Sequence, residues 1–85
     1  MADTELLVRY FAGARAAAGV DEERIGVPAG ATVASLAGVL ADRHGPGLER
    51  VLTVCTFLVD EVAGGRERPL EGARQVDVLP PFAGG

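Results

Sequence analysis

The sequence has 85 residues and a net charge of −4, with 48% hydrophobic and 24% charged residues. This length allows one domain, and the composition is typical of a globular protein rather than a disordered or membrane-spanning one. The basic residues are eight Arg and no Lys, which excludes Schiff-base and phosphate-loop chemistry that needs a lysine amine. The negative charge argues against a nucleic-acid partner and favours docking on positively charged partner surfaces.

The first ten residues read MADTELLVRY. They lack the basic segment and the long apolar run that signal peptides and membrane anchors require. We therefore expect a soluble, cytoplasmic protein without a membrane partner.

The first predicted strand covers residues 5–11, where apolar and outward-pointing side chains alternate. Because Arg9 prefers water, the side chains that alternate with it are expected to face the core: Leu6, Val8 and Tyr10. Phe11 follows on the same side as Arg9, which places it on the outer face of the sheet.

A short helical turn and a loop are predicted for residues 13–23, which are rich in Ala and Gly, and a second strand for residues 24–27. The longest predicted helix begins after Thr32, a plausible N-cap, and ends near His44. Gly45 is then expected at its C-terminal cap.

The second half of the chain predicts one more helical turn at residues 48–52 and a strand at residues 54–59. Asp60 and Glu61 form a candidate tight turn, after which residues 62–63 begin a return strand.

The last predicted strand covers residues 74–79. Alternation turns Val76 and Val78 toward the core, and turns Gln75, Asp77 and Leu79 outward. Pro80 and Pro81 end the strand because neither has an N–H group for the ladder.

This order of strands and helix predicts an α+β fold, a mixed sheet with one main helix packed on one face. We expect one domain at residues 1–79, followed by a flexible, extended C-terminal tail at residues 80–85.

No conventional catalytic constellation is found in the sequence. The single histidine, His44, lies near a helix end, where a structural or solvated role is favoured. The single cysteine, Cys55, lies in an apolar segment typical of a small core residue. One Cys and one His do not make a zinc site, so neither a metal nor a bound cofactor is expected. The acidic pairs at residues 22–23 and 60–61 are interpreted as solvated turns.

The end of the chain, Pro80-Pro81-Phe82-Ala83-Gly84-Gly85, has specific physical properties. The two prolines favour an extended exit from the sheet, and six extended residues reach about 20 Å. Gly84 and Gly85 have no Cβ and can pass through a channel too narrow for other residues. A terminal carboxylate is ionised at neutral pH and becomes an acyl donor after activation, for example as an acyl-adenylate.

These features together resemble the small subunit of molybdopterin synthase, a bacterial relative of ubiquitin. The likeness is carried by VRYFAGAR at residues 8–15, TVASLAGVLADRHG at 32–45, FLVD at 57–60 and RPLEGARQVDVLPPFAGG at 68–85. The resemblance implies a ubiquitin-like β-grasp fold. It also implies a sulfur carrier that is not an enzyme on its own and serves as the sulfur-donating subunit of a heteromeric sulfurtransferase.

The family mechanism implies three partners. A ubiquitin-activating-type adenylyltransferase uses ATP to adenylate Gly85, and a sulfur-donating sulfurtransferase then provides the sulfur of a thiocarboxylate. The tail inserts into the large subunit of molybdopterin synthase, which builds the dithiolene of the molybdenum cofactor. In this mechanism the backbone at Gly84 passes through a narrow channel, and Phe82 anchors the tail. Pro80 and Pro81 begin the tail and direct it away from the sheet.

Two other functions are compatible with such a tail. One is a related sulfur carrier for thiamine, cysteine or a sulfur-containing natural product, and the other is a ubiquitin-like protein modifier. The sequence departs from the family pattern at Asp60-Glu61, where Asn is common, and at Gly64-Gly65, which is loose for a strand.

An apolar docking patch is also predicted. Phe11 and Leu79 both fall on the outward face, and Val62 or Ala63 extends the patch. The alternative is that a loop covers one or both of the two larger side chains.

Overall fold

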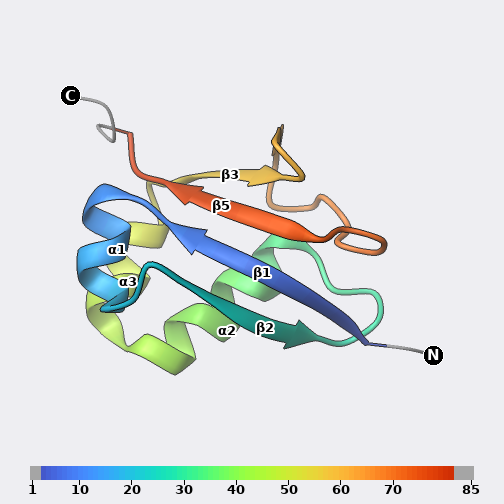
Figure 1. Ribbon diagram of the computed structural model, residues 1–85, viewed down its shortest axis with the longest axis horizontal. Helices are drawn as coiled ribbons and strands as arrows, with labels where there is room; N and C mark the ends of the chain where they lie inside the picture. The colour runs from blue at the N-terminus through green and yellow to red at the C-terminus, as the bar shows by residue number, and fades with distance from the viewer. Residues whose placement is uncertain (1–2, 82–85) are drawn as a thin grey trace.

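A computed structural model of the chain describes residues 3–81. Within this range, a five-stranded mixed sheet has its three helices on one side (Figure 1). The elements in chain order are β1 (Thr4–Tyr10), α1 (Ala12–Ala18), β2 (Glu22–Val27), α2 (Val33–His44), α3 (Pro46–Leu52), β3 (Thr56–Val59), β4 (Val62–Gly64) and β5 (Gln75–Leu79). The predicted α+β architecture is confirmed, with α2 as its longest helix.

The strand order in the sheet is β2-β1-β5-β3-β4. The central pair, β1 and β5, is parallel, and the other neighbouring strands are antiparallel. Because the central strands run the same way, the end of β1 and the end of β5 lie at the same edge of the molecule (Figure 1). This arrangement brings Phe11, directly after β1, next to the segment that leaves β5.

The core lies between the helices and one face of the sheet. The predicted inward side chains of the two central strands are all buried: Leu6, Val8, Tyr10, Val76 and Val78. They form one cluster with the buried positions of α2 and α3, such as Leu36, Leu40 and Leu48. Burying large aliphatic side chains stabilises the fold by about 1.5–3 kcal/mol each.

The main helix begins and ends where the sequence predicts. Thr32 is its N-cap, and Thr32 and Ser35 form a reciprocal capping box in which each side chain binds the other's backbone N–H. Gly45 follows the helix at φ 94°, a conformation that glycine adopts without steric cost.

Several short elements differ from the prediction. β1 ends at Tyr10, so Phe11 is the N-cap of α1 instead of the last strand residue, and α3 begins at Pro46 instead of residue 48. The helical turn expected within residues 13–23 is a complete helix, α1, which packs against α3. The second strand begins at Glu22 instead of residue 24, because the backbone pairs with β1 from Arg9 onward. The third strand begins at Thr56 instead of residue 54, and Val54 is 60% exposed in a turn before it.

The predicted tight turn between β3 and β4 is confirmed. Asp60 and Glu61 both have positive φ, 49° and 72°, as a two-residue type I′ hairpin turn requires. The Asp60 carboxylate accepts hydrogen bonds from the backbone N–H groups of Arg74 and Gln75, each 3.0 Å long. The turn is therefore tied to the start of β5.

Candidate docking face and tail exit

The sheet face opposite the helices carries a group of half-buried and exposed apolar side chains. Cross-strand pairing places Leu58 opposite Ala63 on one side and Asp77 on the other, so these three side chains share a face. Leu79 pairs with Thr56 on the same face. We call the group Phe11, Leu58, Ala63 and Leu79 the outer patch.

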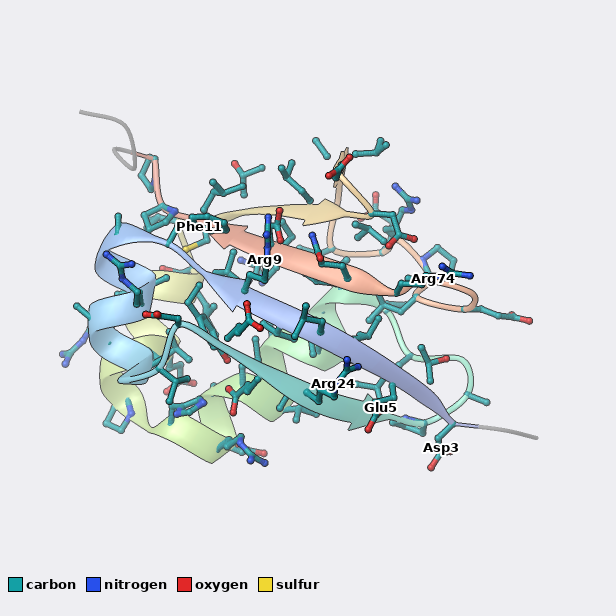
Figure 2. The ribbon with its side chains drawn as sticks, in the orientation of Figure 1. Asp3, Glu5, Arg9, Phe11, Arg24 and Arg74 are labelled. Carbon is teal, nitrogen blue, oxygen red and sulfur yellow. The ribbon has the colours of Figure 1, made fainter. Side chains whose placement is uncertain are left out.

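Phe11 completes the outer patch from β1. Its N–H donates to the carbonyl oxygen of Val78 at 3.2 Å, so the residue lies beside the end of β5. Its ring is half-buried, and the guanidinium carbon of Arg9 lies 5.4 Å from the ring centre (Figure 2). Phe11 and Leu79 therefore flank the point where the chain leaves the sheet.

Val62 and Ala63, the two smaller residues predicted for the patch, lie on opposite faces of β4. Ala63 pairs with Leu58 on the outer face, whereas Val62 pairs with Val59, whose side chain points toward the helices. Val62 is nevertheless 58% exposed because β4 is an edge strand. The role of the patch in docking stays a prediction.

Sequence reasoning missed Leu58. Its signal was present in the segment Phe57-Leu58-Val59, where the residues on either side of Leu58 are buried in the core. Alternation along this strand turns Leu58 outward, into the centre of the patch.

An ion pair lies beside the apolar side chains. Arg9 donates from Nε and Nη2 to the two carboxylate oxygens of Asp77, at 2.9 and 3.1 Å. Asp77 points outward as predicted, yet it is only 5% exposed because Arg9 and Gln75 cover it. The hydrogen bond and charge of Asp77 raise the pKa of Arg9, and the carboxylates of Glu22 and Glu61 raise it further.

A second polar cluster lies at the other surface of β1. The Glu23 carboxylate accepts from Tyr10 Oη at 2.6 Å and from Arg43 Nε at 2.9 Å, and it lies 2.5 Å from His44 Nε2. The interpretation of Glu23 as a solvated turn residue is wrong, because three side chains from β1 and α2 enclose it. His44 has the structural role that the sequence favours, with its ring edge-on to Tyr10.

The cluster changes the protonation behaviour of its members. Burial alone raises the pKa of Glu23, but the hydrogen bonds from Tyr10 and His44 outweigh burial and hold it below its usual value. Burial, followed by the hydrogen bond to Glu23, raises the pKa of Tyr10 far above its usual value. These groups form a structural clamp between β1, β2 and α2 rather than an acid–base pair for catalysis.

Cys55 is half-buried, and its thiol donates to the carbonyl oxygen of Val51 at 3.2 Å. Burial raises the pKa of this thiol, which makes it a weaker nucleophile at neutral pH. Residues 3–81 contain no cluster of three or more His, Cys, Asp or Glu side chains that could hold a metal ion. No helix in this part of the chain is long and apolar enough to cross a membrane.

The predicted tail is described in part. β5 ends at Leu79, and Pro80 and Pro81 follow it. Phe82, Gly84 and Gly85, the predicted anchor, spacer and reactive residue, lie outside the described residues. The described geometry nevertheless fixes where this segment begins, at the edge of the outer patch.

A protein-family model matches residues 8–85, nearly the whole sequence, and its description is the ThiS family. The chain belongs to the ThiS family. A relative from Chlamydomonas reinhardtii, named as a molybdopterin synthase sulfur carrier subunit, is 30% identical over 83 residues. That alignment covers 95% of this chain and 99% of the relative, which confirms the resemblance on which the sequence interpretation rests.

Solved structures show the same fold. SAMP1 from Haloferax volcanii superposes with a TM-score of 0.82 at 24% identity, covering 96% of this chain and 100% of that one. A Pyrococcus furiosus protein named as subunit 1 of a molybdopterin converting factor gives a TM-score of 0.75 at 27% identity, covering 93% and 99%. The predicted ubiquitin-like β-grasp fold is confirmed, within a family of ubiquitin-like sulfur carriers.

Proposed function

We propose that this protein is the sulfur-carrier subunit of a molybdopterin synthase and that Gly85 carries the sulfur. One observation supports the proposal above others: the family match extends through Gly85, the residue proposed to carry the sulfur. The last described residues, Pro80 and Pro81, follow β5 beside the outer patch. The molybdopterin pathway is favoured over thiamine or cysteine synthesis because the aligned relative is named for it.

The chemistry proposed for the tail takes place inside partner proteins. A carboxylate oxygen of Gly85 attacks the α-phosphorus of ATP in an adenylyltransferase, and pyrophosphate leaves. A sulfur-donating sulfurtransferase then supplies the sulfur that replaces AMP on the acyl carbon. The resulting thiocarboxylate enters the large subunit of the synthase and donates its sulfur there, in the cytoplasm.

The fold supports a role in which this chain carries the sulfur and partner proteins perform the chemistry. A carrier that visits several active sites needs a reactive end that extends well beyond its folded core, and six extended residues span about 20 Å. The outer patch lies at the base of that extension and gives a partner a surface to bind while the tail enters its active site. Gly84 and Gly85 meet the steric demand of a narrow channel.

Mass spectrometry tests the proposal directly. The purified chain is incubated with the adenylyltransferase of the same organism, ATP and a sulfur donor, and we expect the mass increase of one oxygen-to-sulfur exchange. Deleting Gly85, or adding one Ala after it, should abolish that increase while circular dichroism shows an unchanged fold. A native chain that never gains sulfur, or an extended chain that still does, would contradict the proposal.

A further inference from the structure

The Arg9–Asp77 ion pair lies among the apolar side chains of the outer patch. It lies between Phe11 on one side and Leu58 on the other, on the face that the helices leave uncovered. A partner that covers this face removes the pair from water. The free energy of docking therefore depends on how completely the polar atoms of the pair are satisfied once water has left.

The two members of the pair differ in this respect. Both oxygens of Asp77 accept hydrogen bonds, Oδ1 from Arg9 Nε and Gln75 Nε2 and Oδ2 from Arg9 Nη2. Arg9 uses Nε and Nη2 in these bonds, and within residues 3–81 its Nη1 donates to no acceptor. The Arg9 side chain remains 39% exposed, whereas that of Asp77 is 6% exposed.

We propose that Arg9 donates from Nη1 to an uncharged acceptor oxygen on the large subunit of molybdopterin synthase when that subunit covers this face. The inference rests on the proposed function, since it concerns the proteins that receive the tail. Asp77 is the positioning residue: it holds the guanidinium in place with two bonds so that Nη1 points away from the pair.

The guanidinium is fixed before any partner arrives. Two parallel hydrogen bonds to Asp77 and the contact with the Phe11 ring restrict its rotation, so little side-chain entropy is lost when a third group binds. A Lys at this position has no fork of donors and cannot hold both oxygens of Asp77 while it contacts a partner.

The charges around Arg9 indicate the chemistry of the acceptor. Asp77 neutralises the guanidinium through its two hydrogen bonds, and Glu22 lies opposite Arg9 in the pairing of β1 with β2, so its carboxylate also acts on the guanidinium. A partner carboxylate would meet these like charges, whereas a backbone carbonyl or a side-chain amide oxygen would not. A partner without any acceptor at this point leaves the N–H groups of Nη1 dehydrated and unpaired, which selects against it.

The competing explanation is that the pair only joins β1 to β5. The two explanations predict opposite effects for the variant Arg9→Met with Asp77→Leu, which replaces both charges by apolar side chains of similar size. Such replacements of an ion pair are often neutral or stabilising for folding. If the pair is only structural, a more apolar face binds the partner as well as before or more tightly.

The experiment measures the affinity of the purified large subunit of molybdopterin synthase, from the same organism, by isothermal titration calorimetry. We expect the double variant to bind about 10- to 100-fold more weakly, because the partner's acceptor is left buried without a donor. The matched control is Glu5→Gln with Arg24→Gln, which removes a second ion pair of this face, at the far end of β1 (Figure 2). Its affinity should remain within about twofold of the native value.

A second variant, Arg9→Lys, keeps the charge and guards against misfolding of the double variant. It should weaken binding by about tenfold if the fixed guanidinium is the donor, since a Lys amine cannot reproduce that geometry. Unchanged or tighter binding in a folded variant overturns the role of Arg9, while sulfur loading of the native chain continues to support the carrier function. A native chain that neither binds the large subunit nor loads sulfur overturns the proposed function and this inference with it.

Discussion

Glu23 joins three separate parts of the chain through one carboxylate. It binds Tyr10 on β1 and both Arg43 and His44 at the end of α2, and its own side chain is 13% exposed. Removing its charge leaves these donors with weaker partners in a half-buried position. Glu23→Gln is therefore expected to lower the free energy of unfolding by about 2 kcal/mol, which lowers Tm by roughly 10 °C.

The adjacent residue provides the control for this prediction. Glu22 lies on the same strand with an exposed side chain. Glu22→Gln should change the free energy of unfolding by less than about 0.5 kcal/mol. Thermal melts of both variants by circular dichroism test the difference, and equal stability of the two variants would show that the Glu23 contacts contribute nothing.

The same carboxylate predicts a pH dependence. Because the folded-state pKa of Glu23 lies below its unfolded value, the unfolded chain binds more protons in acid. The stability that Glu23 provides is thus present above the unfolded pKa, about 4.3, and is lost as the pH falls through the folded pKa. Urea unfolding of the native chain and Glu23→Gln should show a difference at pH 7 that shrinks below about pH 4.3.

Some features of single residues follow from local sequence patterns, whereas others depend on contacts between distant residues. Alternation is local, so it predicts correctly which side chains of β1 and β5 face the core. The contacts of Glu23 with Arg43 and His44 span about twenty residues, and no local pattern predicts them. Asp77 shows both cases: its outward direction follows from alternation, but its burial depends on Arg9, which is 68 residues away.

At the scale of elements, the hairpin turn between β3 and β4 carries a backbone cost. Glu61 has φ 72°, a region that disfavours residues with a Cβ by roughly 1 kcal/mol. Glu61→Gly removes this cost but adds roughly 0.4–1 kcal/mol of unfolded-state entropy, so we expect Tm to rise by no more than about 4 °C. Ala29→Gly is the opposite control, since Ala29 is exposed with an ordinary φ and glycine there adds entropy only to the unfolded chain.

Differential scanning calorimetry separates these two glycine variants. The prediction for Glu61→Gly fails if both substitutions lower Tm, because relief of backbone strain then does not exceed the gain in unfolded-state entropy. In that case the Asp60-Glu61 turn, which departs from the family pattern, has no net cost for the stability of the fold.

The elements themselves were predictable in proportion to their local signals. α2 has an N-cap, apolar spacing and a C-terminal glycine, and its predicted bounds are those observed. α1 and α3 have seven residues each and Phe11 or Gly45 as N-caps without side-chain hydrogen bonds, so their extents depend on packing against each other. The start of β2 is set by pairing with β1, which a single segment does not encode.

At the scale of the whole molecule, the parallel pairing of β1 and β5 organises the proposed function. It places the end of both strands, and therefore Phe11, Leu79 and the start of the tail at Pro80, at one edge of the sheet. The sequence predicts each of these parts separately, but their proximity comes from the sheet order. A partner that binds this edge holds the start of the tail at a fixed distance from its own active site.

This arrangement predicts that the outer patch contributes to the affinity for the large subunit and not to the stability of the fold. Phe11→Ser and Leu79→Ser each remove half-buried apolar area from the outer patch without touching the core cluster. We expect each variant to bind the large subunit of molybdopterin synthase at least about tenfold more weakly, as for central apolar residues of other interfaces. Val20→Ser is the control, because Val20 is a 40% exposed valine in the loop before β2 and lies outside the patch.

Calorimetric titration gives the affinities, and thermal melts give the folded fraction of each variant. If the patch docks the partner, the two patch variants lose affinity while they remain folded, and Val20→Ser keeps the native affinity. If the patch serves only to cover the sheet, the patch variants lose stability instead, and their folded fraction binds normally. The second result would leave the tail alone to hold the partner, and a peptide of residues 80–85 should then compete with the full chain at similar concentrations.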